Sequence, residues 1–312
     1  MLCNVREKLC GCTWPPRAPL ASLNALSIAV LSARLLLSLS HTSAALRHEE
    51  ALIHNHLRML YSVQENGNII TGSSSEPLIA EASAQIMNFS VEKPYQRGEE
   101  PYMDLWGLLG EFVNEDLAAE GTFGDLIGRS LSTSAMDCAI HRLSKDRVCE
   151  LQYQTPVTVA EYYKALLTDE AWETLRQSIP ANHAQLSTKS ATTTFENAFQ
   201  DAYFHFSHYG MANDCYPMRD NISWAIWLRG LAILCPFNQE VIDRMFPIYF
   251  STLGNLSPET MSANLEQDKI GQSITPDNAD IQFAEALSIF SAGNRSPYIA
   301  VVHLCLDGEP RH

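Results

Sequence analysis

Two short stretches near the C-terminal end of the chain carry polar residues that could do chemistry. Asp243 stands at the front of VIDRMFPIYF, a run that otherwise reads as a buried strand. Burying an unpaired carboxylate is costly, so an acid in this position is normally paired, hydrated or bound to a metal ion. The second stretch, LEQDKI, is also strand-like and carries Gln267 and Lys269. We expect the two stretches to contribute to one site.

The alternation of side chains along a strand decides which residues of LEQDKI face Asp243. Residues two apart share a face, so Gln267 and Lys269 point the same way. With those two directed towards Asp243, Glu266 and Asp268 lie on the opposite face. A shift of one residue in the register would reverse this arrangement and turn Glu266 and Asp268 inward.

The elements that must position these residues follow from the hydrophobic pattern. Strands are expected over four segments in the last third of the chain: 230–235, 242–250, 263–270 and 297–306. A helix over 276–292, capped by Asp277, is expected between the last two strands. The rest of the chain reads as mainly helical, with helices over 20–61, 75–87, 103–119, 121–140, 155–167, 168–178 and 195–210. Thr158 and Glu161 have the spacing of a capping box.

The helix expected over 195–210 carries aromatic and histidine residues. Four aromatic residues would share one of its faces: Phe195, Phe199, Tyr203 and Phe206. Aromatic side chains at this spacing usually form a core. His205 and His208 would share a helix side, but no third ligand is evident nearby. A packed or surface pair is therefore favoured over a metal site.

The length of 312 residues allows one large domain or two small ones. We expect residues 1–47 to form a leader, either helical or disordered. Residues 48–312 would form a single α/β domain with a helical insertion at about 151–210.

Without the inserted helices, the order from Gly121 onward is α-β-β-β-α-β, which resembles the core of the PD-(D/E)XK nuclease-like superfamily. The resemblance implies a restriction-endonuclease-like α/β (α+β) fold, with a small mixed sheet and a large helical N-terminal part. It also implies a divalent cation, Mg²⁺ or Mn²⁺, at the meeting point of the second and third strands. The implied catalytic residues are Asp243, Gln267, Lys269 and the first-helix acid Asp125, with Asp243 and Gln267 as metal ligands.

The chemistry of phosphodiester hydrolysis explains these residue types. A metal ion polarises the phosphoryl oxygen and activates a water molecule, and Mg²⁺ prefers hard oxygen ligands. A lysine beside the metal can orient the water and offset charge on the phosphate. The chain departs from the family pattern, because Gln267 replaces an acid and Asp125 replaces the usual glutamate.

Five segments resemble an uncharacterised group of proteins from mushroom-forming basidiomycete fungi: 75–87, 121–131, 195–210, 229–250 and 296–308. The corresponding segments in that group commonly read GxRGEL, IDxxxPV and QxKxR. Here Thr122 and Phe123 replace a polar pair, and Gly271 stands in place of a basic residue. These changes point to drift and to loss of catalysis. The chain is also expected to be a shortened member of the group.

The composition of the chain limits which partners and which cellular location we expect. Acidic residues outnumber basic ones 36 to 21, and the formal charge of -15 disfavours a broad nucleic-acid surface but leaves a local cleft open. The apolar segment 20–40 is about long enough to cross a bilayer, but Arg34 opposes insertion. We therefore favour a helix packed on the domain over a membrane span or a secretion signal. Scattered cysteines indicate a reducing, intracellular compartment, cytoplasmic or nuclear.

Each candidate residue also has a plain structural interpretation. Asp243 could pair with Arg244 or Arg229, Lys269 could be a solvated edge-strand lysine, and Asp125 could meet a helix dipole. Three functions therefore remain open. They are a degenerate metal-dependent phosphodiesterase, an inactive interaction module of the same fold that binds a protein partner, and a helical structural domain without a site.

Overall fold

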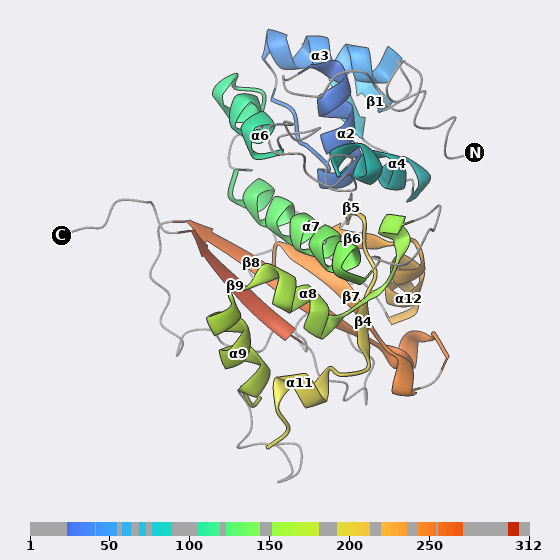
Figure 1. Ribbon diagram of the computed structural model, residues 1–312. Coiled ribbons are helices and arrows are strands. Elements are labelled where there is room, and N and C mark those ends of the chain that lie inside the picture. The colour runs from blue at the N-terminus through green and yellow to red at the C-terminus, as the bar shows by residue number, and fades with distance from the viewer. Residues whose placement is uncertain are drawn as a thin grey trace, which may run out of the picture. The chain divides into compact units, whose positions relative to one another are not determined.

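The computed structural model shows a mixed α/β protein (Figure 1). It describes residues 24–40, 42–54, 58–63, 69–72, 77–88, 105–118, 123–143, 152–180, 192–212, 220–235, 242–253, 255–270 and 299–305. The chain groups into two compact units, which are considered separately. The first unit comprises residues 1–133, 149–154 and 207–210, and the second comprises 134–148, 155–206 and 211–312. The domain boundaries expected from the sequence stay a prediction.

Four α-helices lie entirely within the first unit, among its described residues: α2 (Ala25–Leu35), α3 (Ser43–His54), α4 (Pro77–Met87) and α6 (Leu105–Asn114). Helix α2 begins with a capping box, in which Asn24 accepts from the backbone N–H groups of Leu26 and Ser27. Its apolar residues, including Ile28 and Leu31, are buried. Arg34 is buried as well, and its Nε donates to the carbonyl oxygen of Ser207 at 2.9 Å.

The expected helix over 20–61 is wrong in two places: α2 ends at Leu35 and α3 begins only at Ser43, and the C-terminal end of the segment is a strand. Strand β1 (Met59–Val63) pairs antiparallel with β2 (Ile69–Gly72), and all five residues of β1 are exposed. The helical spacing of Leu52 and Met59 suggested a continuing helix. The β-branched run at Ile69 supplies a partner strand, and a pairing of this kind leaves no trace in local periodicity.

The second unit is built on a curled mixed sheet around β7 (Arg244–Phe250). Strands β6 (Leu231–Leu234) and β4 (Ala202–Phe204) pair antiparallel with successive parts of one edge of β7, and β8 (Met261–Ile270) pairs antiparallel with the other. Strand β9 (Ile299–Cys305) runs parallel to β8. The strands expected at 230–235, 242–250, 263–270 and 297–306 are confirmed. The helix expected over 276–292 lies outside the described residues.

Helices cover both faces of this sheet (Figure 1). Helix α12 (Asp220–Leu228) packs Ile226 against Ala263 and Leu265 on one face. On the other face, Tyr163 of α8 (Val159–Leu166) reaches Asn264 of β8. These contacts follow from the alternation of side chains along β8.

The remaining elements are short, apart from one helix. They are α7 (Phe123–Leu143), η1 (Gln152–Gln154), β3 (Val157–Thr158), α9 (Asp169–Gln177), α11 (Phe195–Ala198), β5 (His208–Met211), η3 (Ser251–Leu253) and η4 (Pro258–Thr260). Strand β3 pairs with β4. Thr158 caps α8 as expected, because its hydroxyl accepts from the N–H of Glu161 at 3.1 Å.

The expected helix over 195–210 is wrong beyond Ala198. The segment continues into β4, where Ala202 and Phe204 are buried and Tyr203 is half-buried. Strand alternation therefore replaces helical spacing, because pairing with β7 satisfies the backbone of this segment. The two histidines do not share a helix. His205 follows β4 and packs against Trp227, with ring centroids 5.0 Å apart, and His208 begins β5.

Within the part of the chain that the structure describes, no helix has both the length and the apolar character that a membrane crossing needs.

Candidate functional site

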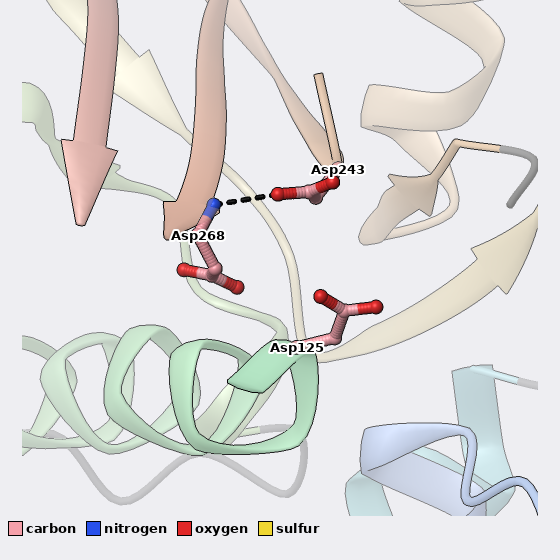
Figure 2. Close-up of side chains that lie close together, drawn as sticks. All are labelled: Asp125, Asp243 and Asp268. Carbon is pink, nitrogen blue, oxygen red and sulfur yellow. Dashed lines mark hydrogen bonds between the residues drawn. The ribbon is translucent and has the colours of Figure 1, made fainter. Parts of the chain in front are cut away.

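Backbone hydrogen bonds hold Asp243 between two strands, immediately before β7. Its N–H donates to the carbonyl oxygen of Glu266 at 2.9 Å, and its own carbonyl accepts from the N–H of Cys235 at 2.9 Å. The carboxylate Oδ2 accepts from the backbone N–H of Asp268 at 2.5 Å (Figure 2). The acid at the head of VIDRMFPIYF is thus fixed at the end of the sheet beside β8.

The next residue, Arg244, carries a fully buried guanidinium that binds two acids of β8. Its Nε and Nη2 donate to Oε2 of Glu266 at 3.1 and 3.0 Å. Its Nη2 also donates to Oδ1 of Asp268 at 2.9 Å, and its Nη1 donates to the other oxygen, Oδ2. The side chains of Arg244 and Glu266 are 0% exposed and that of Asp268 is 1% exposed. Ion pairs this deeply buried depend on complete hydrogen bonding.

Two further residues, Asn264 and Tyr163, extend the hydrogen-bond network from Glu266. Its Oε1 accepts from Nδ2 of Asn264 at 2.8 Å, and Oδ1 of Asn264 accepts from the hydroxyl of Tyr163 at 3.1 Å. Burial raises the pKa of Tyr163 well above its ordinary value, and the charge of Glu266 acts in the same direction. Tyr163 therefore stays a neutral hydrogen-bond donor, and it connects helix α8 to the acidic cluster.

Acidic side chains of this cluster bring hard oxygen atoms close together. Asp243, Glu266 and Asp268 bring three carboxylates, and Arg244 is the one guanidinium that the described contacts place among them. Carboxylate oxygens of Asp243 and Asp268 lie within 4.8 Å of each other. Two hard oxygen donors this close together are suited to Mg²⁺ or Mn²⁺.

Three other residues were predicted for the site: Gln267, Lys269 and Asp125. Gln267 is half-buried in β8, between Glu266 and Asp268, so it belongs to the opposite face of the strand. Lys269 is in β8, and its side chain lies outside the described residues. Asp125, labelled in Figure 2, is the acid in the first turn of α7 and belongs to the first unit.

The alternative register identified in the sequence is the one that brings Asp268 to Asp243. The three residues that the candidate set lacked are Arg244, Glu266 and Asp268. Their signal is the E-x-D spacing of β8 opposite an arginine of β7. That signal has meaning only once Arg244 is known to pair with Glu266 across the strands.

Cys235, next to Asp243, provides a test of this local environment. Burial raises the pKa of the Cys235 thiol to about 12, and the charge of Asp243 adds to the increase while Arg244 opposes it. At pH 8 we expect iodoacetamide to label Cys235 about a thousandfold more slowly than an ordinary thiol, because the thiolate is the nucleophile. Mass spectrometry of digested protein measures this rate, and labelling at an ordinary rate would contradict the environment described.

The same pKa sets the sign of a stability effect. The thiol has a higher pKa in the folded chain than in the unfolded chain, where it is 9.0. Its contribution to stability is therefore complete below about pH 9 and is lost as the pH rises towards about 12.

Comparisons with known proteins gave no match: no protein-family model, no curated protein and no solved structure is significantly similar to the chain. The interpretation of the site therefore rests on its geometry.

Proposed function

We propose that the chain binds one divalent cation, Mg²⁺ or Mn²⁺, through Asp243 and Asp268. The observation that carries this proposal is that carboxylate oxygens of Asp243 and Asp268 lie within 4.8 Å of each other. An ion at this position would be bound partly by water, as is usual for Mg²⁺ held by one or two carboxylates.

The reaction class that this site supports best is metal-dependent hydrolysis of a phosphodiester. The proposal also holds that the chain has a nuclease-like core with its elements in the α-β-β-β-α-β order. A relationship to the fungal group that the sequence resembles is part of the same proposal. The predicted roles of Gln267 and Lys269, polar residues on the same strand as Asp268, stay part of this proposal. A metal ion at Asp243 would polarise the phosphoryl oxygen and activate a water molecule.

A second candidate, a non-catalytic interaction module of the same fold, is favoured by one contact. Both carboxylate oxygens of Asp268 already accept hydrogen bonds from Arg244. The guanidinium could therefore supply part of the positive charge that a metal ion supplies in a nuclease. Such a chain would keep the fold without hydrolysing a substrate.

Thermal melting in Mg²⁺ or Mn²⁺ tests the cation site. A ligand that binds the native state at one hundred times its Kd stabilises it by about 2.7 kcal/mol. We expect a rise in Tm for the wild type, and no rise for Asp243→Asn, which keeps the shape of the side chain but removes its charge. Asp169→Asn is the matched control, because Asp169 is an exposed acid at the start of α9. It should respond like the wild type.

Three outcomes distinguish the proposals. If neither Mg²⁺ nor Mn²⁺ raises the Tm of the wild type, the cation site is wrong. If the metal binds, Mn²⁺-dependent cleavage of plasmid DNA or single-stranded RNA that disappears in Asp243→Asn supports the phosphodiesterase. Binding without cleavage of either substrate supports the interaction module.

A further inference from the structure

We infer that Arg244 is a positioning residue of the cation site, which holds the carboxylate of Asp268 in place beside Asp243. The inference rests on the proposed function, because it concerns the same site. Arg244 would not touch the cation. It would act through Asp268, and the pair Glu266–Asn264 would keep the guanidinium itself in place.

The backbone and the side chain of Asp268 are held by different residues. Its backbone N–H is bound by the carboxylate of Asp243, and both of its carboxylate oxygens accept from Arg244. A carboxylate has about four lone-pair sites, so accepting two N–H groups leaves sites for a metal ion. The side chain of Asp268 has therefore little freedom to rotate, while it can still offer an oxygen ligand.

Arg244 is itself immobilised through a chain of contacts that ends on another element. Its Nε and Nη2 share one oxygen of Glu266, whose second oxygen is held by Asn264. Asn264 is in turn held by the hydroxyl of Tyr163 on α8. Every side chain in this chain of contacts is buried. Outer partners that orient metal ligands typically change metal affinity by about 10–100-fold when they are mutated.

A role for Arg244 in positioning and a role in charge alone predict different results. If Arg244 acted only through its charge, Arg244→Lys would leave cation affinity unchanged. A guanidinium is a planar fork that binds two acids at once, whereas an ammonium is a point charge that cannot reproduce this geometry. If Arg244 positions Asp268, Arg244→Lys weakens cation binding although the net charge is the same.

The experiment is a titration of the purified full chain with Mn²⁺ alone, in which electron paramagnetic resonance counts the free ion. We expect Arg244→Lys to raise the Kd for Mn²⁺ by about 10–100-fold. Arg176→Lys is the matched control, because Arg176 also binds two acids, Glu173 and Glu196, but its side chain is 32% exposed. It should bind Mn²⁺ like the wild type. Circular dichroism and urea unfolding without metal establish that each variant is folded at the temperature of the titration.

Tyr163→Phe keeps the inference testable if Arg244→Lys does not fold. It removes only the hydroxyl that holds Asn264, so it should also raise the Kd for Mn²⁺, by less than Arg244→Lys would. If a folded Arg244→Lys variant binds Mn²⁺ with wild-type affinity, the positioning role is wrong and the cation site stands. If Arg244→Lys does not fold, wild-type affinity in Tyr163→Phe has the same meaning. A wild-type chain that binds no Mn²⁺ would overturn both.

Discussion

Arg244→Met is expected to lower the free energy of unfolding by about 3–5 kcal/mol, the usual effect of removing one partner from a buried ion pair. The cause is the pair of acids left behind. Glu266 and Asp268 would keep negative charges in an interior where their side chains are 0% and 1% exposed. Asn264 would still donate to Glu266, but a neutral amide does not offset the charge of a carboxylate as a guanidinium does.

Urea unfolding followed by circular dichroism measures this loss. The control is Arg176→Met, which breaks an exposed ion pair and should change stability by no more than about 1 kcal/mol. Replacing Arg244 together with its two acids, by Arg244→Met, Glu266→Leu and Asp268→Leu, should restore much of the stability, because neither partner of the buried ion pairs is then left without the other. A single Arg244→Met variant as stable as the wild type would show that the cluster is hydrated and open to solvent.

Phe246→Ala is expected to cost about 3–5 kcal/mol, as is typical for a buried phenylalanine. Phe246 of β7 is 0% exposed and lies on the same face of the sheet as Arg244. Its ring centroid is 4.7 Å from that of Phe206 and 6.3 Å from that of Phe204. Phe204 in turn contacts Tyr162 of α8 at 4.8 Å. Alanine would leave a cavity in the centre of this aromatic cluster.

Equilibrium unfolding of two further variants controls this prediction. Phe246→Leu keeps most of the volume and should cost clearly less than Phe246→Ala. Ile179→Ala, at a position that is 49% exposed, should change stability by about 0.5 kcal/mol or less. If Phe246→Ala were as mild as Ile179→Ala, the aromatic cluster would not be the core of the second unit.

Local sequence was sufficient to predict four strands of the second unit. The segments around β6, β7, β8 and β9 are short apolar runs, and such runs identify strands without knowledge of their partners. Thr158 was recognisable as a cap because a cap acts on the N–H groups of the next few residues. Asp243 could be singled out for the same reason, since a charge at the head of an apolar run is visible in the sequence.

Local sequence failed where a partner distant along the chain decides the conformation. The aromatic residues at 195–206 fit helical spacing, yet pairing with β7 makes β4 a strand. Met59 and Leu60 likewise continue a helical pattern but pair with β2. In both cases the hydrogen bonds of the neighbouring strand satisfy the backbone, and periodicity contains no information about them.

The sequence by itself determined the chemical types available to the site: an acid at 243 and alternating acids and polar residues over 266–269. Tertiary structure alone decided which of them meet. Register places Arg244 opposite Glu266, so Glu266 and Asp268 share its guanidinium and the N–H of Asp268 binds Asp243. Register is set by backbone hydrogen bonds between separate strands, and a shift of one residue exchanges the two faces of a strand. That is why Asp268 joins Asp243, and Gln267 belongs to the opposite face of β8.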